Sequence, residues 1–424
     1  IRDYKVTGVQ TCALPISRPR RHQREHPLTV PYWLEDAPSL APALTGAHSA
    51  DVVVIGAGLC GASAALALGR AGVDTIWLEG GRVSHGASGR NAGFLLQGTA
   101  ERYVRGVSLH GRERARRVHA LTRENHAAMA EEVVRLGIDC GYMKRGSLQL
   151  AGSREEEADL LESAALLRED GFAAVEKDVD ALGPALAGAG FRLGVHLPDD
   201  GELHPARFVR GVARAAQGLG VRLYEDTRVT ALHAEAPGDV RLETNAGSVQ
   251  AQIVLVCTNA VAPELLPALR GAIDPVRGQM LATAAAPPVF DCPIYADHGF
   301  DYWRQDEHGR IALGGWRNLD PESEVGTDEA LHPVIQARMT EFLARFEALR
   351  DVPITHRWSG TMGFSRDGLP LVGAAPGASG ALVAAGFTGH GFGFAWVCGR
   401  ALADLVLEGR SEVAELFPAR RARG

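Results

Sequence analysis

The chain has 424 residues, of which 46% are hydrophobic and 22% are charged, and its formal net charge is −7. This composition is typical of a folded globular protein, and the acidic balance argues against nucleic acid as an obligatory partner. The length exceeds what a single hydrophobic core usually supports, so we expect two domains.

The six cysteines are spread along the chain and form no C-x-x-C pair. This spacing disfavours a metal site or a disulfide framework and favours a reducing, cytoplasmic setting. The apolar run at 380–397 is interrupted by Thr388, His390 and several glycines. It falls short of the uninterrupted stretch of about 18 apolar residues that a membrane span needs. We therefore expect no bound metal and no transmembrane helix.

Residues 1–49 are expected to form a tail outside the folded body, partly non-native and partly extended. The opening IRDYKVTGVQTCALPIS shows no helical or strand period and resembles a translated adapter sequence. The basic stretch 18–26 is either a solvated tail or an arm for nucleic acid or a membrane surface. In the proline-rich stretch 27–42, the rings of Tyr32 and Trp33 are expected to clamp an extended segment onto the body.

The stretch from Asp51 to Glu79 has the order of a dinucleotide-binding unit: strand, glycine turn, helix, strand and acid. Gly56 permits the tight turn, Gly58 lets the backbone approach a pyrophosphate, and Gly61 lets the helix pack on the sheet. The helix N-terminus offers unpaired N–H groups to a diphosphate, and the acid can accept hydrogen bonds from ribose hydroxyls. A tight turn that binds no dinucleotide is the alternative.

A second polar glycine loop, SHGASGRNAGF, runs from Ser84 to Phe94. It supplies backbone N–H groups, hydroxyls and the side chains of Arg90 and Asn91 shortly after the ribose-binding acid. A nicotinamide dehydrogenase needs no such loop, whereas a longer, two-headed cofactor such as FAD does. A surface loop without a ligand is the alternative.

The middle of the chain is predicted to mix helices and strands. His204 should mark the entry to a helix, and a parallel strand that begins near Thr227 would bring Val229 near the adenine. Alternating residues on either side of Asn245-Ala246-Gly247 predict a hairpin. The other expected elements up to residue 257 are helices at 101–136, 155–171 and 206–218, and strands at 146–150, 192–197, 221–225 and 253–257.

Residues 263–355 change character and predict a separate substrate domain. Its strand-like segments and one helix indicate an antiparallel sheet with a covering helix. The expected strands are 276–283, 299–305 and 309–316, and the expected helix is 333–346.

The C-terminal part returns to glycine turns. The stretch 366–373 predicts a turn followed by a strand, and 381–385 predicts another strand. GFTGHGFG then runs from Gly386 to Gly393 and leads into a helix. The N-terminus of that helix could stabilise negative charge on a reduced flavin ring.

These elements predict an α/β protein with a Rossmann-like FAD-binding domain and a discontinuous second α+β substrate domain built on an antiparallel sheet. The FAD-binding domain is expected to comprise residues 50–142, 200–262 and 356–424. The substrate domain is expected to comprise residues 143–199 and 263–355.

Three groups of motifs now coincide: GAGLCG with Glu79 and SGRNAG, Val229 with CTNA, and RDGLPLVG with GFTGHGFGFAW. Together they resemble the D-amino-acid-oxidase-type family of FAD-dependent amine oxidoreductases, which includes glycine oxidase, sarcosine oxidase and γ-glutamylputrescine oxidoreductase. The resemblance covers about residues 30–412. PYWLEDAP and the WSG at Trp358 look most like the γ-glutamylputrescine branch.

The resemblance implies that FAD takes a hydride, or its equivalent, from the C–H bond beside an amine nitrogen. The resulting imine is hydrolysed, and the electrons pass to O2 or another acceptor. The residues expected to bind FAD are Gly56, Gly58, Leu59, Cys60, Gly61, Glu79, Gly80, Ser88, Gly89, Arg90, Asn91, Gly93, Val229, Thr258, Asn259, Gly386, Thr388, Gly389, His390 and Gly391.

The sequence departs from the sarcosine oxidase pattern in three ways. The segment 359–362 lacks the cysteine that attaches flavin in those relatives, so we expect non-covalent FAD. Their carboxylate-binding lysine after GHGF is replaced by Gly393, which disfavours a sarcosine-type substrate. Their oxygen-activating lysine would fall near Ala312, and that half of the chain contains no lysine. An electron acceptor other than O2 therefore stays open.

The candidate catalytic residues are Tyr302, Arg304 and His390. Arg304 could hold a substrate carboxylate in a bidentate pair, or could be a surface arginine on an edge strand. His390 could orient water or face the flavin, or could be a core histidine bonded to the backbone. Gln279 could line the flavin ring, or could make a hydrogen bond inside the sheet.

The favoured hypothesis is an FAD-dependent amine or amino-acid oxidoreductase with a small-molecule substrate. Three alternatives remain at this point. They are a flavin dehydrogenase for a hydroxy acid or polyol phosphate, a non-catalytic flavin-binding subunit, and a nicotinamide enzyme.

Overall fold

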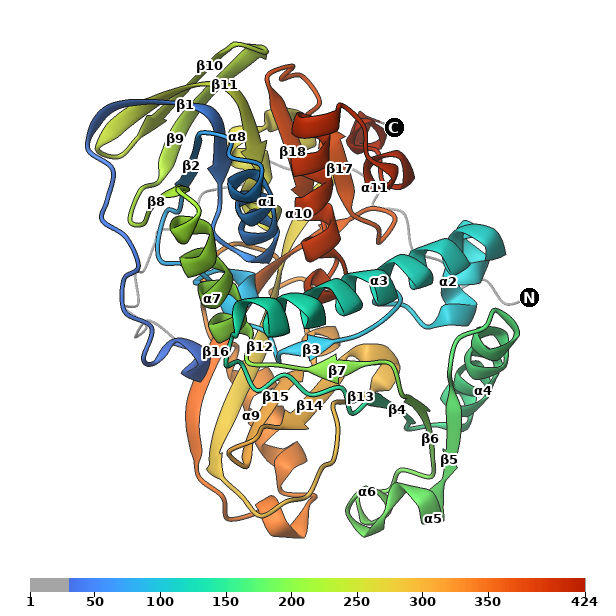
Figure 1. Ribbon diagram of the computed structural model, residues 1–424. Coiled ribbons are helices and arrows are strands. Elements are labelled where there is room, and N and C mark those ends of the chain that lie inside the picture. Colours follow the sequence, from blue (N-terminus) through green and yellow to red (C-terminus); the bar gives the residue numbers. More distant parts are fainter. Residues whose placement is uncertain (1–29, 424) are drawn as a thin grey trace, which may run out of the picture.

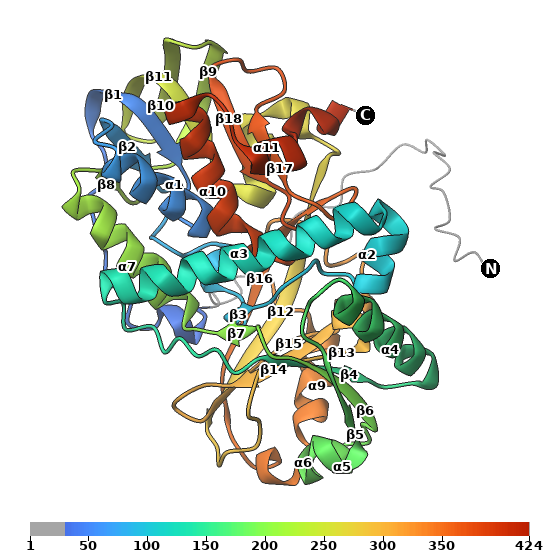
Figure 2. The same ribbon diagram turned by 45° about the vertical axis from the view of Figure 1, so that its right-hand side comes forward.

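Two eight-stranded sheets organise the chain, and the computed structural model describes residues 30–423. In Figures 1 and 2 the first sheet and its helices form the upper part of the molecule, and the second sheet forms the lower part. Helix α3 (Arg112–Leu136) crosses between the two parts in both views. Our expectations for residues 1–29 lie outside the described residues.

The first sheet is the Rossmann-like sheet that the sequence predicts. Its order is β17-β18-β11-β1-β2-β8, with β10 joined to β11 and β9 joined to β10. The neighbours from β18 to β8 are parallel, so the carboxyl ends of β1, β2 and β11 meet at one edge, where open α/β sheets bind ligands. The strands are β1 (Gly46–Ile55), β2 (Thr75–Leu78), β8 (Arg222–Tyr224), β9 (Val229–Ala236), β10 (Asp239–Thr244), β11 (Gly247–Val256), β17 (Leu371–Ala374) and β18 (Ala381–Ala385).

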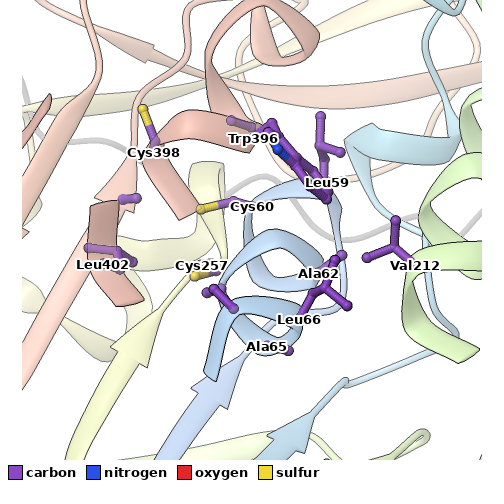
Figure 3. Close-up of a cluster of buried hydrophobic side chains, with 14 of the residues drawn as sticks. Leu59, Cys60, Ala62, Ala65, Leu66, Val212, Cys257, Trp396, Cys398 and Leu402 are labelled. Carbon is purple, nitrogen blue, oxygen red and sulfur yellow. The ribbon is translucent and has the colours of Figure 1, made fainter. Parts of the chain in front are cut away.

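Helix α1 (Leu59–Arg70) is the centre of the helical layer on this sheet. It packs against α10 (Gly391–Glu408) and α7 (Pro205–Gly218). Figure 3 shows the buried cluster at this contact, in which Leu59 of α1 lies beside Trp396 of α10. Small residues permit the close approach, because a Cβ on Gly399 would lie 2.1 Å from the carbonyl oxygen of Cys60.

The second sheet runs in the order β16-β12-β15-β14-β13-β4-β6-β5. Every neighbouring pair is antiparallel except β13 with β4, which is parallel. Helix α9 (Pro333–Leu343) packs on β12 and β15 as the expected covering helix. The strands are β4 (Ser147–Ala151), β5 (Val175–Asp178), β6 (Leu193–Leu197), β12 (Ile273–Ala285), β13 (Ile294–Ala296), β14 (Asp301–Gln305), β15 (Arg310–Gly315) and β16 (Ile354–Ser365).

A two-stranded ribbon, β3 (Phe94–Leu95) with β7 (Gly201–Glu202), stands apart from the two large sheets. The remaining helices are α2 (Tyr103–His110), α4 (Arg154–Glu169), α5 (Val179–Leu182), α6 (Pro184–Gly188), α8 (Ala262–Leu265) and α11 (Glu412–Leu416). Because β16 belongs wholly to the second sheet, the expected boundary at residue 356 cuts through a strand. The domain division otherwise stays a prediction.

Two local expectations need correction. The helix expected at 101–136 is two helices, because Gly111 adopts φ 80° and ends α2 before α3 begins. The strand expected to lie parallel to the first unit at Val229 is β9, which among the described residues pairs only with β10, and that pairing is antiparallel. The parallel neighbour of β2 is β8 instead.

Residues 30–49 pack on the body instead of forming a tail. The Trp33 indole N–H donates to the Asn91 carbonyl oxygen at 2.7 Å, and the Tyr32 hydroxyl donates to Asp306 at 3.1 Å. Leu44 is fully buried, and β1 already begins at Gly46. The aromatic clamp is therefore present, but Tyr32–Leu34 is a 3₁₀ turn, not an extended segment.

Candidate active site

A cavity of about 700 Å³ lies between the edge of the first sheet and one face of the second. It reaches from the glycine turn after β1 to aromatic side chains on β13 and β14. Of the residues expected to bind FAD, those that line it are Gly56, Gly58, Leu59, Cys60, Glu79, Gly80, Ser88, Arg90, Asn91, Val229, Thr258, Asn259, Thr388, Gly389, His390 and Gly391. The four that do not are Gly61, Gly89, Gly93 and Gly386.

The turn after β1 has no room for side chains. Gly56 adopts φ 98°, and a Cβ on Gly58 would lie 2.9 Å from the Ser88 hydroxyl. Gly61 is a packing position behind the turn, because its Cβ would lie 1.9 Å from the Gly56 carbonyl oxygen. The bare backbone of this turn therefore faces the cavity, as close approach of a pyrophosphate requires.

Glu79 follows β2 and closes the same turn. Its carboxylate accepts the backbone N–H of Ala57 at 2.7 Å and that of Gly81 at 2.8 Å. Burial raises the pKa of Glu79, and the two backbone donors oppose that rise. Each carboxylate oxygen keeps a further lone pair, so the group can still accept a ribose hydroxyl.

The second glycine loop is tied to the first turn and to the second sheet. The Ser88 hydroxyl accepts the backbone N–H of Leu59 at 2.9 Å, which fixes the loop beside the N-terminus of α1. Arg90 donates to the Ser359 carbonyl oxygen at 3.0 Å and pairs with Glu329 at 2.7 Å. The side chain of Asn91 bonds within the loop. These side chains hold the loop in shape at the cavity wall.

The end of β11 meets the late glycine turn directly. Asn259 adopts φ 45°, and its side-chain oxygen accepts the backbone N–H of Gly386 at 3.0 Å. Thr388, also at positive φ, donates its backbone N–H to the Gly363 carbonyl oxygen at 2.8 Å. Three turns that are far apart in sequence therefore converge on one cavity.

Two buried polar atoms on the cavity wall have no hydrogen-bond partner. They are the hydroxyl of Thr258 and Nε2 of His390. Buried polar groups are normally satisfied, so these two call for a polar ligand. With the bare glycine turn and the Glu79 carboxylate, they fit a dinucleotide cofactor. Burial lowers the pKa of His390 to about 4, which leaves its ring neutral near pH 7.

The far end of the cavity is aromatic. Phe94, Tyr295 and Tyr302 all line it, with ring centroids between 5.4 and 6.2 Å apart. Burial raises the pKa of Tyr302 to about 12, so its hydroxyl stays protonated. Met280 and Met362 complete the apolar wall. Of the candidate catalytic residues, Tyr302 and His390 thus lie at the cavity.

Arg304 does not reach the cavity, which corrects our expectation. Its guanidinium is fully buried, donates to the Leu203 carbonyl oxygen at 3.0 Å and lies 3.3 Å from a carboxylate oxygen of Glu202. The ring of Trp33 covers it at 5.1 Å. Arg304 shares the face of β14 with Tyr302, but the N-terminal segment occupies that face two residues further along.

Gln279 and His204 have structural roles. The Gln279 amide donates to Glu324 and to the Ala330 carbonyl oxygen, which anchors the loop before α9 and leaves the residue outside the cavity wall. Nδ1 of His204 accepts the backbone N–H of Arg207 at 3.2 Å, as an N-cap at the entry to α7.

Sequence reasoning missed two residues at the aromatic end, Tyr295 and Arg317, both of which line the cavity. Arg317 lies two residues after β15, at the end of the motif GGWR. The paired glycines before it are the one local signal that the chain turns there.

The fold and the cavity define a dinucleotide-binding protein of the α/β class. The chain belongs to the DAO family, described as FAD dependent oxidoreductase, whose model matches residues 51–405. The protein is thus an FAD-dependent enzyme, and the glycine turns, Glu79 and the unpartnered polar atoms fit that cofactor.

Individual relatives agree with this assignment. The chain is 29% identical to γ-glutamylputrescine oxidoreductase of Escherichia coli over 92% of this chain and 91% of the relative. It is 28% identical to glycine oxidase of Geobacillus kaustophilus over 88% of this chain and 96% of the relative. The crystal structure of a glycine oxidase from the same species superposes with a TM-score of 0.74 at 25% identity and covers 86% of this chain and 96% of that one.

Within residues 30–423, no helix is both long and apolar enough to cross a membrane. The same residues contain no group of three or more His, Cys, Asp or Glu side chains that could hold a metal ion.

Proposed function

We propose that this enzyme oxidises the C–N bond of an amine or amino acid to an imine, which water then hydrolyses. The observation that carries the proposal is a single cavity with the dinucleotide turns at one end and a wall of aromatic and neutral polar groups at the other. The names of the similar proteins, glycine oxidase and γ-glutamylputrescine oxidoreductase, support an amine donor.

The bound flavin would supply the chemistry of accepting two electrons from the donor. The chain's own contribution is to bind and orient the donor beside the late glycine turn. Phe94, Tyr295 and Tyr302 form a wall that excludes water, and such a wall disfavours a charged ammonium by desolvation. This favours the neutral amine, the form that can be oxidised. His390 stays neutral and can hold a polar atom of cofactor or donor through Nε2.

We further propose that FAD is bound non-covalently. The cavity wall at 360–362 contains no cysteine, and the thiols of Cys60 and Cys257 lie beside the first turn. A hydrogen bond with Cys257, together with burial, raises the pKa of the Cys60 thiol and keeps it a poor nucleophile. Acid precipitation should release all of the yellow colour into the supernatant, and colour retained in the pellet would contradict this.

The electron acceptor is O2 or another oxidant. Among the described residues the cavity wall contains no lysine, the residue that the sarcosine oxidase pattern places near the flavin for oxygen. The flavin reduced by a donor can be mixed with air and with artificial acceptors, and the faster of the two reoxidations identifies the class of acceptor.

The proposal is tested by anaerobic mixing of the holoenzyme with amines, amino acids and hydroxy acids. Loss of the flavin absorbance band with an amine or amino acid would support it. Bleaching by hydroxy acids or polyol phosphates alone would favour the corresponding dehydrogenase. A holoenzyme that no donor reduces would favour a non-catalytic flavin-binding role.

A further inference from the structure

Four arginines line the cavity, and three of them pair with acids of the fold. Arg90 pairs with Glu329 and Arg102 with Glu156, each at 2.7 Å. Arg228 lies 4.0 Å from Glu264 at the dinucleotide end. Among the described residues, no acid forms an ion pair with the fourth, Arg317.

The chain after β15 aims Arg317 at the cavity. Gly315 adopts φ 133°, and a Cβ there would lie 2.0 Å from the Phe300 carbonyl oxygen. Trp316 adopts a left-handed φ of 56° and buries its ring against Phe342 at 5.0 Å. This two-residue reversal sends the tryptophan into the core and the arginine onto the cavity wall. Residues with positive φ other than glycine carry strain, which the surrounding packing must offset.

Two aromatic rings hold the guanidinium in place. Its central carbon lies 4.5 Å from the ring centroid of Phe300 and 5.2 Å from that of Phe364. The Phe364 ring in turn lies close to Gly389 of the late glycine turn. A Cβ added to Gly389 would lie 3.7 Å from Cζ of the Phe364 ring. A stacked guanidinium loses little freedom when it binds an anion, so the site is preorganised.

The electrostatics also favour an incoming anion. Burial lowers the pKa of Arg317, with only partial compensation from the tyrosines 302 and 295 and from Glu101. The guanidinium nevertheless stays charged near pH 7. Glu101 is exposed, so solvent and salt screen its charge. A half-buried cation with free donors and no paired acid gains from a carboxylate that binds it in a bidentate pair.

We propose that Arg317 is the specificity-determining residue that holds an acidic group of the donor, so that the enzyme acts on amines that carry a carboxylate. This inference rests on the proposed amine oxidation for its catalytic meaning. It corrects the sequence expectation for Arg304, whose charge Glu202 already neutralises. Donors without an acidic group should be poor substrates, because the guanidinium would then remain unpaired.

The binding half of the test needs no turnover. Acetate, propionate and benzoate lack an amine and cannot be oxidised, so they can be titrated into the holoenzyme by calorimetry beside their amides. The wild type should bind the acids more tightly than the amides. Arg317→Gln should weaken acid binding about tenfold or more and leave the amides nearly unchanged. Arg317→Lys should recover part of the loss, because it restores the charge without the planar fork.

The kinetic half compares anaerobic flavin reduction by an amino acid and by its amide. Arg317→Gln should lower the ratio of the flavin reduction rate constant to the donor Kd about tenfold or more for the amino acid. The same ratio for the amide should change by less than about threefold. Arg338→Gln, on the exposed face of α9, is the matched control and should behave like wild type. Equal flavin content and circular dichroism exclude misfolding.

The outcomes separate the two proposals. The role of Arg317 would be overturned if Arg317→Gln weakened the acids and the amides equally, or if it left the binding of the acids unchanged. Either result would count against Arg317 even if amines reduce the flavin. Selective loss of acid binding in an enzyme that no amine reduces would keep Arg317 as an acid-binding residue and reject amine oxidation.

Discussion

The side-chain oxygen of Asn259 accepts the backbone N–H of Gly386 at 3.0 Å. This bond joins the end of β11, in the centre of the first sheet, to the late glycine turn about 130 residues later in the chain. The same side chain fills the space beside Gly363 of β16, where a Cβ would lie 2.6 Å from its oxygen. One amide therefore connects both sheets at the cavity.

Asn259→Ala should weaken FAD retention and stability together. It removes an acceptor from a buried N–H and places alanine at φ 45°, which asparagine tolerates better. The expected loss is about 1–3 kcal/mol in the free energy of unfolding, measured by urea titration. Asn318→Ala, on an exposed side chain, is the control. Unchanged stability with full flavin content would show that the bond does not hold the turns together.

Gly58→Asp should abolish cofactor retention. A Cβ here would already lie 2.9 Å from the Ser88 hydroxyl, and a carboxylate beyond it would enter the space beside the N-terminus of α1 and repel a diphosphate. The measurement is the ratio of flavin to protein absorbance after purification. Gly188→Ala is the control, because nothing lies within 4 Å of its added Cβ. Normal FAD content in Gly58→Asp would remove this turn from the binding site.

The glycine turns were predictable because each is specified locally. Gly56 and Gly58 follow an apolar run and precede a helix, and the fold and the family then follow from that order. Their convergence could not be read from local sequence, because it depends on long-range bonds such as that of Asn259. The four glycines that miss the cavity are packing positions, which the same pattern cannot distinguish from ligand contacts.

The choice of arginine shows where local reasoning ends. Arg304 lies on a strand beside Tyr302, so its spacing alone places it on the cavity face. The segment Tyr32–Leu34 covers Arg304, and the sequence of β14 gives no sign of this cover. Arg317 instead follows a strand, and its direction depends on the positive φ of Trp316, an unusual backbone state for a bulky residue.

Asp200 should make stability depend on pH. Its carboxyl is buried, accepts the Ser147 hydroxyl at 2.6 Å and the backbone N–H of Gln97 at 2.9 Å, and burial raises its pKa to about 7. A raised folded-state pKa means that the stabilising contribution is complete below about pH 4 and is lost as the pH rises through about 7. Asparagine cannot ionise and can keep both hydrogen bonds.

Asp200→Asn should therefore gain stability relative to wild type as the pH rises from about 4 to 7, reaching about 1 kcal/mol or more at pH 8. Urea titrations at several pH values measure the difference, in which the buried histidines cancel because both proteins contain them. Asp351→Asn, at an exposed site, is the control. A flat difference for Asp200→Asn would mean that folding does not raise the pKa of this carboxyl.

Arg304→Ala should cost stability without changing donor preference. The substitution strips Glu202 of one of its two arginine partners, Arg304 and Arg145, in a fully buried site and removes the ring contact with Trp33. Leaving a buried charge without its partner typically costs about 3–5 kcal/mol, and Arg145 should keep the loss near the lower value. Urea titration measures the loss, and the ratio of flavin reduction rates for an amino acid and its amide measures preference. Near-normal stability with selective loss of the acidic donor would return Arg304 to the active site and would contradict the role of Arg317.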